Sequence, residues 1–505
     1  MCPLTCAHMP PGAGRRSGGW LALAFLVWIC AFGAGEVAAQ TNCELVQSRN
    51  LVNLELGTGR ASYISAPRIR CQDGTRIQAD SAAVFQASGF TQLFGAVLFE
   101  DEETLLTADR AHFFNQQARL LAWGGVSLEN RANRSVITGD TLVLLRANDF
   151  RPEDRLTVSG NRPRALLRPA RGGDGEDPAA EDSQDDLSQV DAHRIYLEGE
   201  NLFRAGGEVE LTRDDLLVTA DSMEYVRMEG EITFLSLVDA PPSRITGEGF
   251  QLEGRELDVL LPGDSLRNVW ARGEALLTGD DFRLAAPLIQ IDLESGEVQR
   301  GVALRGEAVE GEAESPRPEA LAQDFLLRGD SIEIVAPGQE IREVVAVGSA
   351  RGEHLGQDSL VTDDTPEVVR RDWMEGDTIR ATFLPPTDED TDGGARMEQL
   401  VASGTARSLY RLEPSQNPDA EAGIDAGGDD AAGERVIGFE EEVVEEVSVP
   451  LEEREMEPLP EFAVHYVTGS RIVIFFQSGE VERMEVEGPT RGLHLEPGRT
   501  TGGTR

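Results

Sequence analysis

A short phrase of apolar and polar positions recurs along the chain: an apolar residue, any residue, Ala or Gly, and then Asp. A partly apolar strand follows it, then a turn and a second strand with Gly before alternating apolar residues. About 30 residues hold two strands of roughly 8 to 10 residues, with no room for a crossover helix. The pattern therefore predicts antiparallel hairpins. Clear copies end at Asp80, Asp109, Asp140 and Asp221, and a weaker one includes Asp191.

The apolar face of each strand changes at the Ala-Asp pair. Ile77 and Ala79 share one face, whereas Ala82 and Val84 fall on the other. Because side chains alternate with a period of two, this switch requires a bulge or a bend. A small residue allows the bend, and an Asp carboxylate can accept backbone hydrogen bonds there. We therefore predict a structural role for the repeat aspartates Asp80, Asp109, Asp140, Asp191 and Asp221.

Stacked hairpins with such bends predict two facing sheets, in which each repeat buries its apolar face against its neighbours. The expected fold is all-β, an elongated antiparallel β-jellyroll of about ten hairpin repeats with acidic disordered insertions. The expected divisions are a signal peptide (1–39), a first module (40–168), an acidic linker (169–189), a second module (190–307), degenerate repeats (325–412), an acidic disordered insertion (413–458) and a final hairpin (459–492).

The amino terminus predicts export. Arg15 and Arg16 precede an apolar run from Trp20 to Ala34, and Val37-Ala38-Ala39 has the small residues of a signal-peptidase site. The run is shorter than the roughly 20 residues of a membrane span. We expect cleavage after Ala39 and a periplasmic location, the alternative being an inner-membrane anchor at residues 20–34.

Removal of the leader leaves two cysteines, Cys43 and Cys71. In an oxidising compartment such a pair most often forms a disulfide, and two free thiols are the alternative. Closing this loop would stabilise the fold by roughly 3 kcal/mol in the chain-entropy model.

Composition excludes some classes of function. The net charge of −44 argues against nucleic acid, because phosphate contacts need clustered cations. All 46 basic residues are arginine. Arginine favours bidentate contacts with phosphate or carboxylate, but a biased base composition of the genome explains the same bias.

The sequence contains no motif that predicts a catalytic or metal-binding site. Five histidines follow the leader, and none is spaced as a metal ligand with another. The sequence Gly263-Asp264-Ser265-Leu266 matches the opening of a serine-esterase signature, but it lies in an expected hairpin turn. We therefore expect a protein that is not an enzyme and has no cofactor, no metal and no catalytic residue. The five histidines are His112, His193, His354, His465 and His494.

The phrases Ile77-Gln78-Ala79-Asp80-Ser81-Ala82 and Leu106-Thr107-Ala108-Asp109-Arg110-Ala111, each followed by Gly-x-Val or Gly-Gly-Val, resemble the OstA-like repeat. That family includes the LptA-like periplasmic bridge proteins of lipopolysaccharide transport. The resemblance is strongest from residue 42 to 168 and weakest beyond 325. The chain departs from the family in its length and in its acidic insertions.

The resemblance implies a twisted β-jellyroll whose apolar interior shelters lipopolysaccharide acyl chains on their way to the outer membrane. It implies as partners lipopolysaccharide or a related glycolipid, and other β-jellyroll transport components stacked end to end. Candidate residues for the lipid groove lie on strands of the best-matching copies, although some of them will only pack the sheets together. They are Val84, Phe85, Val97, Phe99, Phe113, Phe114, Leu121, Trp123 and Val126.

Two other classes of function remain as alternatives. One is a structural envelope or adhesion β-repeat protein without lipid transport. The other is an enzyme such as a polysaccharide-degrading parallel β-helix, which the hairpin pattern disfavours. The preference for a lipid conduit rests mostly on the family resemblance.

Overall fold

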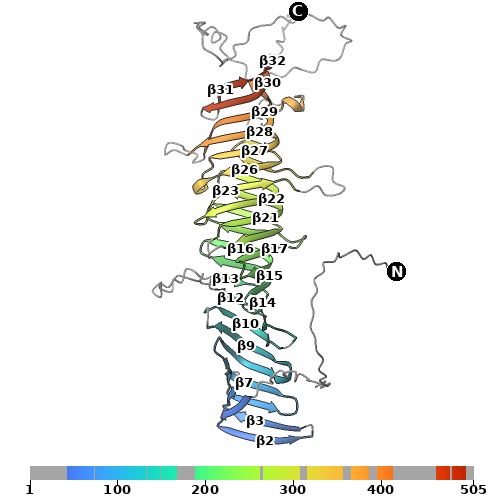
Figure 1. Cartoon of the computed structure of the whole chain (residues 1–505), viewed down its shortest axis with the longest axis vertical. Helices are drawn as coiled ribbons and strands as arrows, with labels where there is room; N and C mark the ends of the chain where they lie inside the picture. Colours follow the sequence, from blue (N-terminus) through green and yellow to red (C-terminus); the bar gives the residue numbers. More distant parts are fainter. Residues whose placement is uncertain are drawn as a thin grey trace, which may run out of the picture. The chain divides into compact units, whose positions relative to one another are not determined.

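The described part of the chain consists of strands joined by tight turns, with three short 3-10 helices (Figure 1). The computed structural model describes residues 43–57, 59–72, 74–131, 134–148, 150–167, 188–261, 266–306, 315–355, 365–385, 395–412, 462–477 and 480–495. The expected leader, the expected acidic insertion and most of the expected acidic linker lie outside these residues. Residues 41–505 form one structural unit.

Thirty-two strands are present in the described residues, and they follow one another along the stack. The first half comprises β1 (Cys43–Gln47), β2 (Asn50–Leu56), β3 (Gly59–Ser65), β4 (Arg68–Cys71), β5 (Arg76–Gln78), β6 (Ser81–Phe85), β7 (Phe90–Glu100), β8 (Thr104–Phe114), β9 (Arg119–Asn130), β10 (Val136–Leu145), β11 (Arg155–Ser159), β12 (Arg164–Leu167), β13 (Ser188–Asp191), β14 (Arg194–Glu198), β15 (Leu202–Arg213) and β16 (Leu216–Val226).

The second half comprises β17 (Glu231–Leu235), β18 (Ser243–Gly247), β19 (Phe250–Gly254), β20 (Glu256–Leu260), β21 (Asn268–Gly279), β22 (Phe282–Glu294), β23 (Glu297–Leu304), β24 (Glu319–Ala322), β25 (Phe325–Arg328), β26 (Ser331–Val335), β27 (Glu343–His354), β28 (Asp372–Leu384), β29 (Arg396–Leu412), β30 (Ala463–Gln477), β31 (Glu480–Glu487) and β32 (Arg491–Leu495). The 3-10 helices are η1 (Asn115–Gln117), η4 (Pro337–Gln339) and η6 (Glu367–Val369).

The strands form two facing sheets, because each long strand bends in its middle and passes from one sheet to the other. In β15, residues 202–206 pair with β14, whereas residues 210–212 pair with β13. We call the layer that contains β3, β6 and β14 sheet 1, and the layer that contains β4, β5 and β13 sheet 2. The pairings are antiparallel throughout the described residues, which confirms the predicted fold class.

The bends lie at the repeated Ala/Gly-Asp phrase. Gly95 on β7 stands against Asp80, and a Cβ atom on Gly95 would lie 2.2 Å from Asp80 Oδ2. Gly95 also has φ +74°, so glycine is required there by both space and conformation. The pairing register of β7 and β8 shifts between Phe94 and Val97, as expected for a bulge. Equivalent positions form the corner column: Asp80, Asp109, Asp140, His193, Asp221, Arg255, Pro287, Asp330, Asp377 and Ser470.

Each sheet carries an inner ladder of apolar residues that stand directly opposite one another on neighbouring strands. Both ladders join one hydrophobic core, since strand alternation turns every second side chain inward. Small and large residues alternate along much of sheet 1, which lets neighbouring side chains interdigitate. Examples from sheet 1 are Ile64, Ala82, Leu93, Ala111, Ala122, Leu142, Val158, Ile195, Ala205, Met223 and Phe234, and from sheet 2 Ile77, Phe99, Leu106, Leu128, Ile137, Ala165, Val190, Leu211, Val218 and Ile245.

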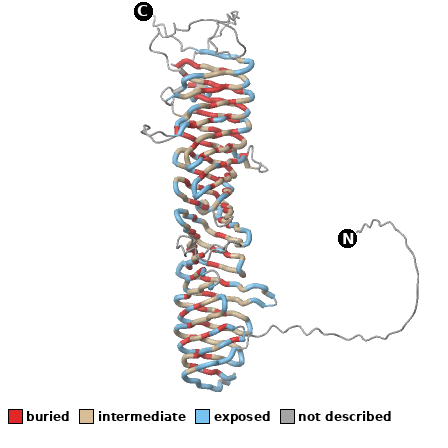
Figure 2. The backbone as a smooth tube through the Cα atoms, turned by 60° about the vertical axis from the view of Figure 1, so that its left-hand side comes forward, coloured by how far each residue is buried: buried red, intermediate tan, exposed pale blue. Residues whose placement is uncertain are grey.

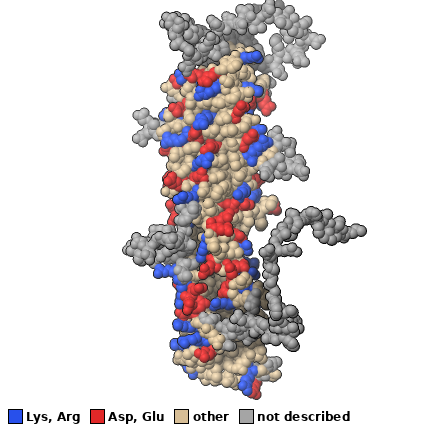
Figure 3. Space-filling model, viewed as in Figure 1, with Lys and Arg blue, Asp and Glu red and all other residues tan. Residues whose placement is uncertain are grey.

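Arginine and acidic side chains form cross-strand ion pairs on the surface, where they are interspersed over the face seen in Figure 3. Arg155 and Glu198 stand opposite each other, with 2.7 Å between Nη2 and Oε1. Arg204 and Glu224 form the same kind of pair at 2.5 Å. Such exposed pairs contribute about 0–1 kcal/mol each, but opposite charges across a ladder favour the observed register.

Both ends of the stack present strand edges. Among the described residues, β1 pairs only with β4 and β2 only with β3, while β31 and β32 each pair only with β30. Exposed residues, drawn in pale blue, mark these ends in Figure 2. Leu51, Val52 and Leu54 on β2 are 44–46% exposed.

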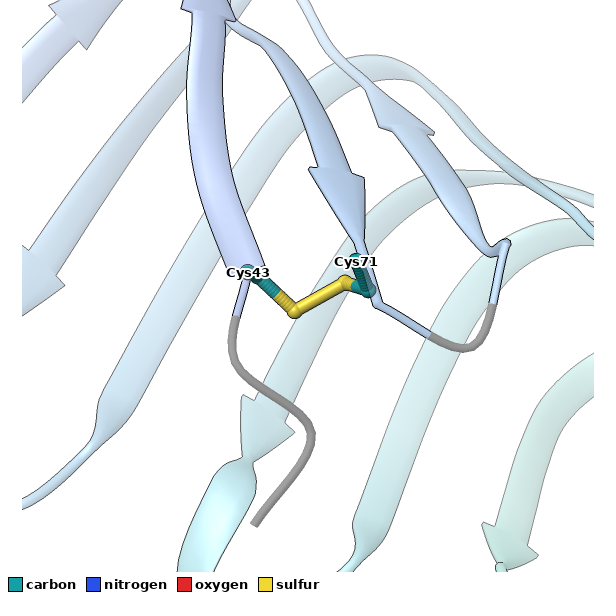
Figure 4. The surroundings of a disulfide bond; sticks show 2 residues. All are labelled: Cys43 and Cys71. Atoms are coloured by element: carbon teal, nitrogen blue, oxygen red, sulfur yellow. A yellow bond between two sulfur atoms is a disulfide. The ribbon is translucent and has the colours of Figure 1, made fainter. Parts of the chain in front are cut away.

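A disulfide between Cys43 and Cys71 joins β1 to β4 at the amino-terminal end (Figure 4). The two residues are direct cross-strand partners. This bond ties β1, the terminal strand of sheet 2, to β4, its only partner among the described residues. Within the described residues, no helix has the length and hydropathy of a membrane span.

Candidate functional site

A cavity of about 390 Å³ lies between the two sheets in the middle of the stack, on the side away from the corner column. Its apolar floor comes from both sheets: Leu211, Val218 and Ile245 from sheet 2, and Phe234 and Val259 from sheet 1. These side chains are almost fully buried, since Phe234 is 1% and Ile245 0% exposed. The volume falls in the range of small-molecule sites, about 300–1,000 Å³.

The mouth of the cavity is built from hairpin tips. The hairpin tip of β15 and β16 contributes Arg213, at the end of β15, with Asp214 and Asp215 from the turn. The hairpin tip of β22 and β23 contributes residues 295 and 296 from the turn and Glu297 from the start of β23. Asp214 has φ +49°, a left-handed conformation that Asp tolerates in tight turns. Partly buried apolar side chains stand just inside these tips: Leu216, Leu261 and Leu266. The mouth is therefore polar outside and apolar within.

A second cavity of about 110 Å³ lies next to the first, toward the amino terminus. Leu128, Ile137 and Leu167 line it from sheet 2, and Leu197 and Phe203 from sheet 1. Leu167 pairs directly with Ser188, which belongs to the larger cavity, so the two cavities are neighbours. Together they make an interrupted apolar groove between the sheets.

Contacts between hairpin tips of opposite sheets bridge the groove on either side of the cavities. Toward the amino terminus, Arg146 Nη2 of sheet 1 lies 2.8 Å from Asp101 Oδ2 of sheet 2. Toward the carboxyl terminus, Gln339 Nε2 of sheet 1 donates to the carbonyl oxygen of Glu248 of sheet 2 at 2.6 Å. We call these contacts clasps. The accessible interior lies between them.

Beyond the Gln339 clasp the interior is filled. Ile289, Ala303 and Ile332 of the sheet 1 ladder are 0% exposed. The open side is also sealed, because Ala336, Ile341 and Ala395 from hairpin tips are buried in the core. A further clasp ties Ala395 of sheet 1 to sheet 2, through Gln323 and Asp281.

Five of the predicted groove residues belong to the interior. Val97 and Val126 are core residues at 2% exposure, and Val84, Phe99 and Phe113 are partly buried against the core. They pack the two sheets together near the amino-terminal end. The two cavities are lined by other residues.

The other four predicted groove residues lie on the outer face of sheet 1. Phe85, Phe114, Leu121 and Trp123 alternate with the inward-facing Ala82, Ala111 and Ala122. Their alternation turns them away from the interior, so they do not line the groove. The aromatic rings instead form an outer cluster with Phe90 and His112, and the pKa of His112 is lowered by burial there.

The repeat aspartates occupy the corner column with one exception. Asp80, Asp109 and Asp140 each stand against a glycine of the next strand. Asp221 Oδ2 accepts a hydrogen bond from the backbone N–H of Leu237 at 2.7 Å. His193, rather than Asp191, occupies the corner of its repeat, where Gly207 stands against it.

Asp191 lies two residues before that corner, within β13. It is buried, and its carboxylate accepts hydrogen bonds from Arg164 Nε at 2.9 Å and from Gln189 Nε2 at 2.6 Å. The small residue of this repeat is Ala192, which is followed by His instead of Asp. Asp191 is therefore a strand residue of sheet 2.

Titratable side chains gather at the carboxyl-terminal end of sheet 2. Asp372 and Arg411 are 2% and 1% exposed, and Arg411 Nε lies 2.8 Å from Asp372 Oδ1. Burial raises the pKa of the neighbouring Tyr410, and the Asp372 charge raises it further. Tyr410 pairs across the strands with His465, and His465 with His494. Burial, and then proximity to His494, lower the pKa of His465.

Among the described residues, no group of three or more His, Cys, Asp or Glu side chains could hold a metal ion. His193 lies near Glu208 on the surface, with 3.4 Å between Nε2 and Oε2. His354 stands opposite Asp372 at the end of β27. The serine-esterase-like Gly263-Asp264-Ser265 lies outside the described residues.

Sequence reasoning missed the residues that line the larger cavity. The alternation Ile232-Thr233-Phe234 and Leu257-Asp258-Val259 carried the signal, because it marks inward faces in the second module. The clasps carried no such signal, since Glu248 and Gln339 are distant in sequence.

No family model matches the chain, and no curated protein matches it. Among solved structures, LptH, the LptA-homologous periplasmic component of the lipopolysaccharide transport device from Pseudomonas aeruginosa, matches 44% of this chain and 94% of its own. The identity is 13% and the TM-score 0.15, so this likeness carries no argument about function.

Proposed function

We propose that this protein is a non-catalytic glycolipid carrier of the bacterial cell envelope. In this proposal it shelters the acyl chains of lipopolysaccharide or a related glycolipid between its two sheets. It acts in the periplasm as a bridge component on the route to the outer membrane. The single observation that carries the proposal is the apolar cavity between the sheets, which opens on the side away from the corner column.

The chemistry of the cavity suits an acyl chain. Its floor is apolar and its mouth polar, so a chain can enter while its headgroup stays in water. Each methylene removed from water contributes about 0.8 kcal/mol. Apolar burial alone therefore supports binding, and the site needs no catalyst or cofactor.

The ends of the stack support a role in an assembly. Among the described residues, strand edges at both ends have no partner strand, and they can accept strands of a second protein. Exposed Leu51 and Val52 lie at one end, and exposed Leu493 and Leu495 at the other. We propose that neighbouring β-jellyroll components add to these edges and extend the groove.

Site-specific photo-crosslinking tests the proposal. A photoreactive residue at Leu261, inside the mouth, should capture labelled lipopolysaccharide during transport in cells. The same residue at Phe114, on the outer face of sheet 1, is the matched control and should not capture it. Both side chains are partly buried, so they differ mainly in the face they occupy.

Two results would contradict the proposal. Capture of lipid at Phe114 but not at Leu261 would place binding outside the groove. Capture of proteins alone at both positions would favour a structural envelope or adhesion protein.

A further inference from the structure

Acidic side chains dominate the mouth of the larger cavity. Asp214 and Asp215 come from the β15–β16 turn of sheet 2, Glu248 from the β18–β19 turn, and Glu297 from the start of β23 in sheet 1. All four are exposed and therefore face solvent at the entrance. They stand on both sides of the opening, so a headgroup held there lies among them.

One basic residue lines the same cavity. Arg213 Nε lies 3.9 Å from Asp214 Oδ2, and the Arg213 side chain is 19% exposed. Its charge is thus directed at a carboxylate of the mouth. Four carboxylates against one guanidinium leave the charged residues that line the cavity with a net charge of −3.

From this charge distribution we infer that the cavity takes acyl lipids whose headgroup carries no net negative charge, such as an uncharged sugar or an amine, and disfavours lipids with a phosphate at the mouth. The inference rests on the proposed acyl-chain function and narrows its substrate class to glycolipids, lipopolysaccharides included, in which the sugars next to the acyl chains carry no phosphate. The apolar floor binds the chain, whereas the acidic mouth selects the headgroup.

The expected selectivity is moderate because the carboxylates are exposed. Repulsion between a phosphate and several carboxylates within about 10 Å should weaken binding about tenfold at low ionic strength. At about 0.5 M salt the screening length is only a few ångströms, so the penalty should largely disappear. Salt dependence therefore separates this effect from steric exclusion.

Two probes with the same twelve-carbon chain test the inference: n-dodecyl maltoside, which is uncharged, and n-dodecyl phosphate. Each is titrated below its micelle concentration into the exported full-length protein by calorimetry, in about 20 mM salt with EDTA. The test variant is Asp214→Asn, Asp215→Asn, Glu248→Gln and Glu297→Gln combined. It should bind dodecyl phosphate about tenfold more tightly than the native protein, with dodecyl maltoside changed less than about twofold.

A matched variant removes four acidic charges far from the mouth: Glu44→Gln, Glu102→Gln, Glu398→Gln and Glu482→Gln. These side chains are exposed and do not line the cavity. This variant should leave both affinities within about twofold of native, since charges beyond a Debye length are screened.

Suppose that dodecyl maltoside binds but that the variant with four substitutions at the mouth binds dodecyl phosphate no more tightly than the native protein. This result would overturn the inference, although the proposed acyl-chain function would stand. An equal gain for dodecyl phosphate in the matched variant would also overturn it, since net charge rather than the mouth would be responsible. Failure of both probes to bind would overturn the proposed function and the inference with it.

Discussion

The middle of the stack and its carboxyl-terminal part share one architecture but differ inside. Between β13 and β20 the sheets enclose a cavity, whereas between β21 and β29 Leu277, Leu284 and Ile289 fill the interior at 0% exposure. Both regions have the same inner ladders and the same corner column. The open side differs, because tip residues such as Ala336 and Ala395 plug it only in the carboxyl-terminal part. Access to the interior therefore depends on the hairpin tips rather than on the strands.

The largest expected effect tests how firmly the closed region is held. Arg411→Leu leaves the Asp372 carboxylate buried without its charged partner, and Asp372 Oδ2 already has no hydrogen bond in the structure. We expect a loss of about 3–5 kcal/mol in the unfolding of this region. Hydrogen exchange of β28 and β29, recorded at increasing urea concentrations, measures this loss of stability.

The double variant Arg411→Leu with Asp372→Leu is the control for that loss, because it removes both charges and leaves none unpaired. It should recover part of the stability. If the single variant matched the native protein, the pair would not hold this end of the core.

A matched pair of truncations compares the two interiors directly. Leu284→Ala in the closed region should cost about 3 kcal/mol, because the surrounding packing leaves a void. Leu261→Ala at the cavity mouth should cost only about 1 kcal/mol, since this side chain is already partly exposed. Local hydrogen exchange measures both, and equal losses would mean that the cavity is packed in solution.

Acid should weaken the carboxyl-terminal end further. The pKa of His465 is lowered in the folded protein by burial and by His494, so below pH 6.5 the unfolded chain binds more protons. The free energy of unfolding should therefore be highest above pH 6.5. It should decrease as the pH falls from 6.5 toward the lowered pKa of the folded state. The His465→Gln variant should show a flatter dependence in urea titrations between pH 7.5 and 5. His112, whose pKa burial also lowers, contributes to the remaining slope.

The smallest expected effect concerns the boundary between the two regions. Gln339→Ala removes the hydrogen bond to the Glu248 carbonyl oxygen that clasps the sheets beside the cavity. The loss in stability should be about 1 kcal/mol or less. Release of dodecyl maltoside in stopped-flow experiments should become about twofold faster. An unchanged rate would show that this clasp does not bound the groove.

The hairpin architecture was predictable because its signals are local. The small-residue–Asp phrase with a glycine strand predicted the corners at Asp80 and Asp109, and the switch of apolar face predicted the bulges. At Asp191 the predicted corner was wrong by two residues, because the corner residue of that repeat is His193. It also passed over Gly254-Arg255, a corner without an aspartate.

The candidate groove could be predicted only in part, because both faces of a sheet 1 strand are apolar near the amino terminus. Phe114 and Trp123 pack outside against Phe90 and His112, so aromatic character did not mark the interior. The position of the cavity depends on contacts such as Glu248 with Gln339, which lie 91 residues apart. No local pattern reports such a contact.

Each strand contacts mainly its neighbours in the stack, so the strands at the two ends have fewer stabilising contacts than those in the middle. Unfolding should therefore begin at the two ends. Thermal unfolding should then proceed by fraying rather than in one step, and calorimetric and van't Hoff enthalpies should differ. The Cys43–Cys71 disulfide fixes the terminal strand β1 to β4, and it does so at the amino-terminal end only. A reductant should therefore speed proteolysis from the amino-terminal end while leaving the other end unchanged.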